Sequence, residues 1–419
     1  MSDSGRAQQA ADAVAGRTFF QRTFAAFHYP EFRLLWMGAC LSSVGTWMQT
    51  VAQNWLVLDL TNSPRMLGLD AFLGQIPIFL FSLIGGVIAD RMDRRRLLVG
   101  SQLVQMACAF LLASLFALGL VQVWHILALS FVVGLAQAFG GPAYSALVPT
   151  LVPVKELQNA VALNSIQFNL ARVIGPMLGG LLLTTVGAAW CFGINGLSYV
   201  APILALTALP MRQTPMKAGS TLFGSLKEGL NFVAAREGLP ALIAIAFFMT
   251  AFGIPLMVYI PVVVRDVFHG GPDLFTWMLV VSGLGAIIGA LLVAAFGAIP
   301  DKGRIALLTL ALLGVLIAGF GLSKSLVLSS VLLFLGGVAL VAVFAMISSL
   351  VQLIVPDEMR GRVMSVYNVA FRGGMPFGAL ISGELITHSN VGTVLALNGV
   401  ILFLIAMWFL VIQRRVARL

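Results

Sequence analysis

The sequence is poor in charged residues and in cysteine. Asp, Glu, Lys and Arg make up 10% of its 419 residues, whereas soluble domains carry about 25%. This scarcity excludes a molecule whose surface is mostly in contact with water. The three cysteines, Cys40, Cys108 and Cys191, all lie in apolar runs without a regular spacing, so we expect inert thiols rather than disulfides or a metal site.

Several functional signals are also missing. The sequence has no Gly-x-x-x-x-Gly-Lys loop for nucleotide phosphates, no cluster of metal ligands and no convincing nucleophile–base pair. We therefore expect neither an enzyme nor an ATP-driven pump, and neither a cofactor nor a metal. No signal peptide is visible in residues 1–30, which are polar and basic, and the absence of a soluble domain argues against a receptor or sensor.

Apolar runs, in contrast, are abundant. Hydrophobic residues make up 59% of the chain. The runs are roughly 20 residues long, which is the length that crosses a bilayer. We predict an all-α polytopic membrane protein with twelve transmembrane helices. They are expected at Phe32–Leu58, Met66–Ala89, Leu97–Leu118, Val123–Leu147, Leu157–Val186, Trp190–Leu209, Leu239–Val264, Leu274–Phe296, Ile305–Leu322, Leu326–Ile354, Val363–Ile386 and Val394–Ile412.

A wide polar break at residues 210–238 divides the runs into two groups of six. Its second part, Leu222–Arg236, has apolar residues at helical spacing and is predicted to form an amphipathic helix on the membrane surface. The expected domains are an N-terminal tail (1–31), a first six-helix bundle (32–209), a linker (210–238), a second six-helix bundle (239–412) and a C-terminal tail (413–419).

The distribution of Lys and Arg predicts the orientation. If the N-terminus is cytoplasmic, 20 of the 25 Lys and Arg residues lie on the cytoplasmic side, three lie outside and two lie within helices. Basic residues favour the cytoplasmic side of membrane proteins, so both termini are predicted to be cytoplasmic. The net charge of +9 is then a topology signal rather than a sign of nucleic-acid binding.

The two groups of helices repeat one another. An offset of 203 residues pairs Ser145–Val148 with Ser348–Val351, Pro153 with Pro356, Gly175 with Gly378, and Gly180 with Gly383. A second echo joins Gly86-x-x-x-Asp90-Arg91 to Gly297-x-x-x-Asp301-Lys302-Gly303-Arg304. Parallel repeats of this kind place a substrate cavity between the halves, which rock to open it on alternate sides.

These motifs resemble those of the major facilitator superfamily over essentially the whole chain. Gly86, Asp90, Arg91, Arg94 and Arg95 match its loop between the second and third helices, and Gly175-Pro176-Met177-Leu178-Gly179-Gly180 resembles the fifth-helix signature of its exporters. The sequences around Pro153, at Ala162–Asn164, at Arg172 and at Pro356–Arg362 are similar to the branch with the enterobactin exporter and macrolide efflux pumps. The resemblance implies a secondary-active transporter with two six-helix pseudo-repeats, expected as a monomer in the bacterial plasma (inner) membrane.

The resemblance also implies roles for the two motifs. The loop residues would form a conformational latch that holds the halves together on the cytoplasmic side; alternatively, the arginines anchor to lipid headgroups. The latch candidates are Gly86, Asp90, Arg91, Arg94, Arg95, Asp301 and Arg304. Gly175, Pro176, Gly179 and Gly180 would form a helix bend that blocks ion leak, or simply allow tight helix packing.

Charged residues within the helices are candidates for proton coupling and substrate contact, because a charge in lipid is costly and needs a partner or water. Asp70 and Glu384 are expected near the outer ends of facing helices, as carriers of protons taken up from outside, or as ordinary interface residues. Arg172 and Arg372 are expected near mid-depth, where they would contact substrate, pair with an acid, or lock helices through carbonyl groups.

The first and fourth helices are expected to line the cavity. Their polar candidates are Gln49, Gln53, Asn54, Gln137 and Tyr144, next to Trp47, Met48 and Phe139, although many such side chains belong to helix cores. The predicted function is a proton-driven exporter of a small amphipathic compound such as a drug, siderophore or metabolite. The alternative is an importer or lipid flippase of the same fold with different coupling.

Overall fold

The computed structural model describes residues 24–209, 222–295 and 301–417, and all regular elements within them are helices. The helices that precede residue 210 form the first half of the molecule. They are η1 (Ala25–His28), α3 (Pro30–Thr61), α4 (Pro64–Arg91), α5 (Arg94–Ala117), α6 (Val123–Leu147), η2 (Val148–Thr150), η3 (Val154–Glu156), α7 (Leu157–Thr185), α8 (Ala188–Ser198) and α9 (Val200–Ala208).

The second half follows α10 (Leu222–Ala235), which occupies the range predicted for the amphipathic helix. Its helices are α11 (Leu239–Gly253), α12 (Pro255–Val258), α13 (Ile260–Asp266), α14 (Pro272–Ala295), α15 (Lys302–Leu322), α16 (Leu326–Ile354), α17 (Asp357–His388), α18 (Val391–Met407) and the π-helical turn η4 (Trp408–Gln413).

Ten segments of the described chain are long and apolar enough to cross a membrane. Helices α3 and α17 fall outside this set although each has 32 residues, because polar side chains are spread along α3 and charged ones extend into the first half of α17. With these two, the number of long helical segments agrees with the twelve predicted. The most visible difference lies in α17, which begins at Asp357 rather than at the predicted Val363, since its first turns are charged and continue beyond the apolar region.

Two predicted helices are interrupted, and prolines explain both breaks. The run Trp190–Leu209 divides at Tyr199, three residues before Pro202, and the run Leu239–Val264 divides at Ile254 and Tyr259, just before Pro255 and Pro261. Proline has no N–H to donate and is best tolerated in the first turn of a helix. The short helices therefore continue one another with local changes of direction.

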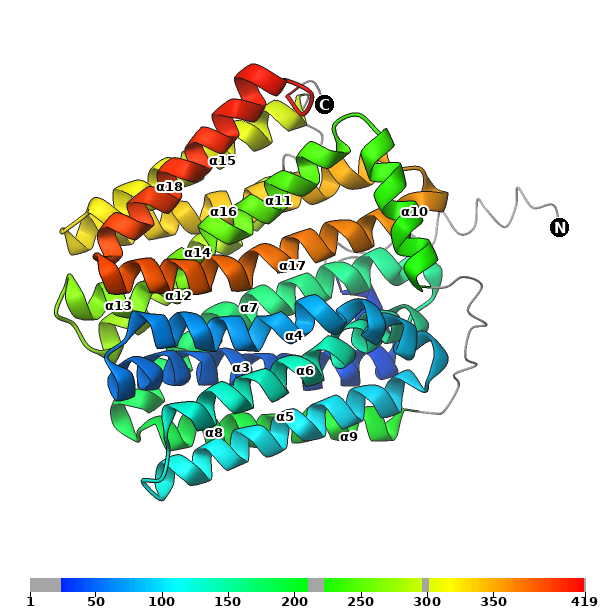
Figure 1. Ribbon diagram of the computed structural model, residues 1–419. Coiled ribbons are helices and arrows are strands. Elements are labelled where there is room, and N and C mark those ends of the chain that lie inside the picture. The colour runs from blue at the N-terminus through cyan, green and yellow to red at the C-terminus, as the bar shows by residue number, and fades with distance from the viewer. Residues whose placement is uncertain (1–23, 210–221, 296–300, 418–419) are drawn as a thin grey trace.

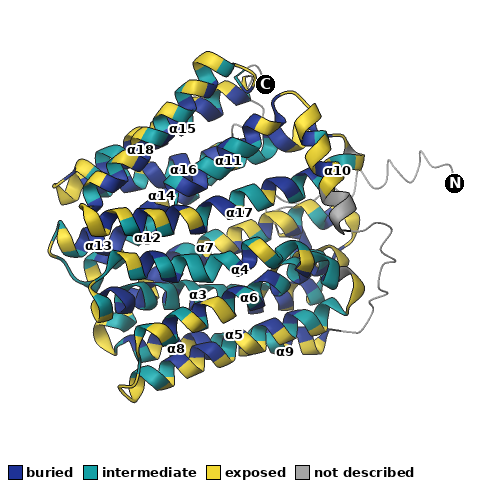
Figure 2. Ribbon diagram, viewed as in Figure 1, coloured by how far each residue is buried: buried dark blue, intermediate teal, exposed yellow. Residues whose placement is uncertain are grey.

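Helix α10 marks one end of the molecule, which we call the α10 end (Figure 1). It packs on α17 and α4, and Arg362 of α17 pairs with Glu228 at 3.0 Å. The opposite end, where α3 turns into α4 and α13 into α14, is called the Arg65 end. Exposed residues follow the helices along their length (Figure 2), and they include large apolar side chains such as Leu41, Leu103 and Leu111, as expected for a surface in contact with lipid.

The two halves pack in the same way and meet through equivalent helices. Contacts within them join α3 to α7 and α4 to α6 in the first half, and α11 to α17 and α14 to α16 in the second. Between them, α4 packs against α17 and α7 against α14 (Figure 1). The sequence repeat is reflected in this packing, because α4 corresponds to α14 and α7 to α17.

The repeated glycines occupy equivalent positions as well. A Cβ atom added at Gly175 would overlap α3 within the first half, and one added at Gly378 would overlap Ala251 of α11 within the second. At Gly180 the added atom would overlap Thr276 of the other half, and at Gly383 it would press on Pro64 and Tyr259. Each pair therefore permits the same two close approaches, one inside a half and one at the interface.

Candidate functional site

A cavity of about 1060 Å³ is lined mainly by helices of the first half, and α17 closes it from the second half with Ser365, Asn368, Val369 and Arg372. In each helix that lines the cavity, the lining residues lie in the part nearer to the α10 end. They span Leu35–Trp47 in α3, Ile78–Val87 in α4 and Ser365–Arg372 in α17. Toward the Arg65 end, the α4–α17 and α7–α14 contacts close the space between the halves. The cavity is therefore displaced toward the α10 end of the bundle.

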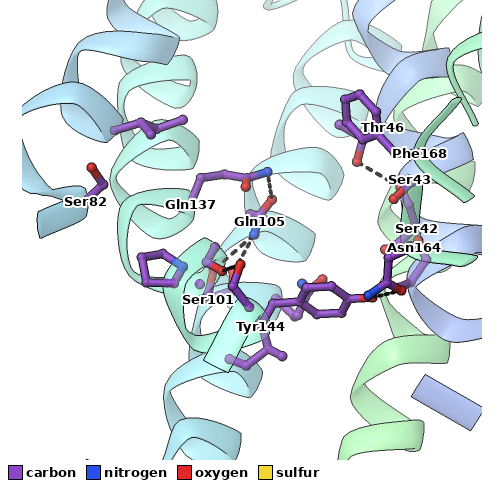
Figure 3. A pocket seen from close by; sticks show the side chains of 18 of the residues that line it. Ser42, Ser43, Thr46, Ser82, Ser101, Gln105, Gln137, Tyr144, Asn164 and Phe168 are labelled. Carbon is purple, nitrogen blue, oxygen red and sulfur yellow. Dashed lines mark hydrogen bonds between the residues drawn. The ribbon is translucent and has the colours of Figure 1, made fainter. Parts of the chain in front are cut away.

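The cavity wall is rich in amides and hydroxyls that bond to one another (Figure 3). The amide Nε2 of Gln137 donates to Oε1 of Gln105 at 3.1 Å, and the Tyr199 hydroxyl donates to the same oxygen at 3.3 Å. The hydroxyl of Tyr144 donates to Asn164 Oδ1 at 3.2 Å. Polar groups within a helical bundle have to be satisfied by the protein itself or by cavity water, and these pairs do so.

Aromatic rings form part of the wall from α3 and α7. The rings of Trp47 and Phe168 meet edge to face with centroids 6.1 Å apart. The guanidinium of Arg172 lies over the Trp47 ring, 5.9 Å from its centroid. Arg172 therefore has the face of an aromatic ring, which attracts cations, rather than the acidic partner that was one of its predicted roles.

Arg372 lies on the α17 wall of the cavity, and its neighbours there include Asn368, one helical turn earlier. Both side chains are exposed, and the space that exposes them is the cavity. Within the described residues, Arg372 has no carboxylate at ion-pair distance. Of the roles predicted for Arg372, the structure therefore favours contact with a substrate in the cavity over an ion pair with an acid.

Asp70 lies inside the first half, at the junction of α3, α4 and α6. Ser130 Oγ donates to Asp70 Oδ1 at 2.5 Å, and Gln53 Nε2 donates to Oδ2 at 2.8 Å. The residue is 5% exposed and does not line the cavity. Its place is therefore a polar core of the half rather than an outer mouth.

A chain of amides leads from Asp70 along α3. Gln53 accepts a bond from Gln49 at 3.3 Å, and Gln49 accepts one from Asn195 of α8 at 2.6 Å. One turn beyond Gln49, Thr46 lines the cavity and shares a 3.2 Å hydrogen bond with Tyr199. Hydrogen-bonding side chains thus occupy the whole distance between the buried carboxylate and the cavity.

Glu384 has a different environment, at the surface of the Arg65 end. Its carboxylate pairs with Arg65 of the other half at 3.0 Å and with His388 at 3.2 Å. Nearby, Arg265 of α13 donates to Asn62 at 2.5 Å, which also joins the two halves. These contacts fasten the closed end of the molecule.

Only some of the residues that were predicted to line the cavity do so in the structure. Gln137, Tyr144, Trp47 and Arg372 line the cavity, whereas Gln49 and Gln53 belong to the amide chain. The remaining candidates, Asn54, Met48 and Phe139, do not line it. Sequence reasoning missed the polar face of α5. Ser101 and Gln102 are followed one helical turn later by Gln105 inside an apolar run, a signal that could have revealed it.

Comparison with known proteins agrees with this architecture. The family described as transmembrane secretion effector matches residues 21–418 of the chain. The chain belongs to this family of the major facilitator superfamily. It is similar to macrolide efflux protein A of Streptococcus pyogenes, with 22% identity over 90% of this chain and 94% of the relative, and to the enterobactin exporter EntS of Escherichia coli, with 27% identity over 90% and 92%. A POT family transporter in complex with a conjugated peptide has the same fold, with a TM-score of 0.73 at 12% identity, covering 92% of this chain and 96% of that one.

The chain is thus a multi-pass membrane transporter and not an enzyme.

In this transporter, the loop between α4 and α5 holds helix ends together. Asp93 caps α5 by accepting bonds from the N–H groups of Arg95 and Arg96, at 2.9 and 3.3 Å. Arg94 donates to the Ala146 carbonyl at 3.0 Å, and Arg95 to the carbonyls of Leu209 and Thr207. These bonds satisfy carbonyl groups at the ends of α6 and α9.

The remaining latch candidates are less engaged among the described residues. Arg91 and Arg304 are exposed, and Asp301, the residue just before α15, has a left-handed backbone conformation. The side chain of Asp90 lies outside the described part of the structure, as does Gly297 of the second loop motif. The bonds described for Arg95 stay within the first half, so the role of this loop as a latch between halves stays a prediction.

The fifth-helix signature of the facilitator lies within α7, which is one continuous helix through Pro176. Gly175 and Gly179 face α3, where added Cβ atoms would overlap the region of Val44–Met48. Gly180 faces α14. This geometry supports the packing role of the motif.

Proposed function

We propose that this transporter exports a small amphipathic compound from the cytoplasm of a bacterium in exchange for protons. It would act as a monomer in the plasma membrane by alternating access, with the α10 end and both termini cytoplasmic. The observation that carries the proposal is a polar and aromatic cavity that is closed at the Arg65 end and displaced toward the α10 end. The two relatives, a macrolide efflux protein and an enterobactin exporter, support the direction of transport.

The moving parts are proposed to be the two bundles, residues 32–209 and 239–412, joined by the linker at 210–238. Rocking would separate α4 from α17 and α7 from α14 at the Arg65 end, breaking the Arg65–Glu384 pair. In the opposite conformation, Asp90, Arg91 and the Asp301–Arg304 segment would meet at the α10 end as the latch. The contacts that close one end are lost when the other closes.

Proton coupling is proposed to centre on Asp70. A buried acid in a membrane bundle is costly and typical of proton relays. Its Ser130 and Gln53 bonds and the amide chain toward Thr46 connect its protonation state to helices that line the cavity. Glu384, the second candidate, would act at the closed end, where its release from Arg65 accompanies opening.

The test uses everted bacterial vesicles that contain the protein and have an acidified lumen. A macrolide antibiotic and enterobactin, the compounds named for the two relatives, serve as first test compounds. We expect addition of a transported compound to release lumenal protons, and Asp70→Asn to abolish this release. The matched control is Asp59→Asn, which changes an exposed acid on α3.

Two outcomes would contradict the proposal. Proton release that persists in Asp70→Asn would remove Asp70 from the coupling pathway. Uptake of a test compound into the vesicles without any movement of protons would contradict proton-driven export while leaving the transporter assignment intact.

A further inference from the structure

The lining of the cavity has an unusual charge balance. Among the described residues that line it, Arg372 is the only charged side chain, and all other polar groups are neutral amides, hydroxyls or an indole. The acid that is nearest along the network, Asp70, is withdrawn behind Ser130 and Gln53. Arg172 adds a second cation beside the wall, over the ring of Trp47. The cavity therefore presents positive charge without a matching acid.

The polar side chains of the wall also differ in whether they already form hydrogen bonds within the protein. On the α5, α6 and α7 sides, Gln105, Gln137 and Asn164 take part in bonds within the protein. On the α4 and α17 sides, Ser82, Asn368 and Arg372 have no side-chain hydrogen bond within the described residues. A ligand would find free hydrogen-bonding groups on this side, and on α5 it would find the Oε1 acceptor of Gln102, which has no partner in the described structure.

The donors available there suit one ligand chemistry. A guanidinium carries five N–H donors and no acceptor, and it binds carboxylates and similar oxyanions in a forked geometry. Asn368 lies four residues before Arg372 and on the same face of α17, so its amide can add to the same ligand group. The Trp47–Phe168 pair offers an aromatic surface for the rest of the ligand.

We propose that the cavity binds amphipathic organic anions, with the acidic group of the ligand on Arg372 and Asn368 and its apolar or aromatic body against Trp47 and Phe168. Organic cations are disfavoured, because the wall offers them no acid. This inference rests on the proposed function for the role of the cavity as the substrate site. The preference of the cavity for negatively charged ligands does not depend on proton coupling or on the direction of transport.

The experiment measures binding of two xanthene dyes of similar size to the full-length protein in nanodiscs, by fluorescence anisotropy. Fluorescein is the anionic probe and rhodamine 123 the cationic one. We expect fluorescein to bind at least about tenfold more tightly than rhodamine 123, which corresponds to one charge-assisted contact of roughly 1.4 kcal/mol. No ion gradient is needed, so the measurement is independent of the vesicle assay for proton-driven export.

Variants assign the selectivity to Arg372. Arg372→Gln is expected to weaken fluorescein binding by about tenfold and to leave rhodamine 123 binding unchanged or stronger, and Arg372→Lys to retain most of the preference. Arg33→Gln, which changes an exposed arginine of α3, is the matched control. The wild-type preference is informative even if a variant fails to fold.

Three results would overturn the proposal: rhodamine 123 binding as tightly as fluorescein, no binding of fluorescein at all, or fluorescein affinity that Arg372→Gln leaves unchanged. If fluorescein binds selectively but no proton-coupled export is found in vesicles, the substrate class stands and the proposed function fails.

Discussion

Asp70 and Glu384, which the sequence suggested as two proton-coupling candidates, differ strongly in their surroundings. Asp70 is enclosed by Ser130 and Gln53, and no cation pairs with it in the described structure. Glu384 is 44% exposed as a side chain and lies between Arg65 and His388. A change in the charge of the buried Asp70 can therefore alter the packing of the first half. The Glu384–Arg65 ion pair, in contrast, is exposed, and water can replace its contacts.

At this scale we predict that Glu384→Gln has little effect on stability. An exposed ion pair contributes about 0–1 kcal/mol, so the unfolding temperature of the purified protein should change only slightly. Because the pair joins the two halves, the same substitution should increase the fraction of molecules that are open at the Arg65 end. A large loss of thermal stability would show that the pair is part of the structural core rather than a releasable contact.

At the scale of elements, glycines decide how closely helices approach. Gly175 and Gly180 lie on the same helix and differ in what they touch: α3 of the same half for Gly175, and Thr276 of the other half for Gly180. The same distinction holds for Gly378 and Gly383 on α17. One position of each pair holds a bundle together, and the other allows the two bundles to close.

We therefore predict that two similar substitutions have different results. Gly175→Val should lower the unfolding temperature, because overpacking within a bundle costs about 1–3 kcal/mol. Gly180→Val should instead push α7 and α14 apart and favour opening at the Arg65 end. Spin labels at Leu120 and Lys324, exposed residues of that end in different halves, would report the longer distance. Equal effects of the two variants on that distance would contradict the assignment.

At the scale of the whole molecule, the proposed topology places all loops of the α10 end in the cytoplasm. The test is labelling of intact cells with a membrane-impermeant maleimide, after Cys40, Cys108 and Cys191 have been replaced. A cysteine at Lys324, at the Arg65 end, should be labelled, whereas a cysteine at Lys155, at the α10 end, should react only after the cells are permeabilised. The reverse pattern would invert the topology and the direction proposed for export.

Much of the fold could be predicted because a bilayer restricts the possible structures. Backbone groups in lipid have to bond within their own segment, so long apolar runs become helices, and the limits of those runs follow the thickness of the apolar layer. The prediction was less accurate where this constraint ends, as at the charged first turns of α17. The breaks in the Trp190–Leu209 and Leu239–Val264 runs followed from proline chemistry that hydropathy alone does not include.

The site was predicted less completely, for a geometric reason that α3 illustrates. Thr46 and Gln53 are seven residues apart, so they lie on nearly the same helix face but are separated by about 10 Å along the axis. Thr46 lines the cavity, while Gln53 lies beside Asp70 within the closed part of the bundle. Periodicity gives the face of a residue, but its depth relative to the closure of the halves depends on how two bundles meet.

The sequence by itself determined the membrane class, the helices, the two-fold repeat and the family, since all of these follow from local composition and spacing. Only the tertiary structure decided that Asp70 is buried while Glu384 is paired at the surface, that Arg372 is the cation of the cavity, and that Gly180 belongs to the interface between halves. These properties depend on contacts between helices that are distant in the chain, and the apolar pattern of each helix carries no information about its partner.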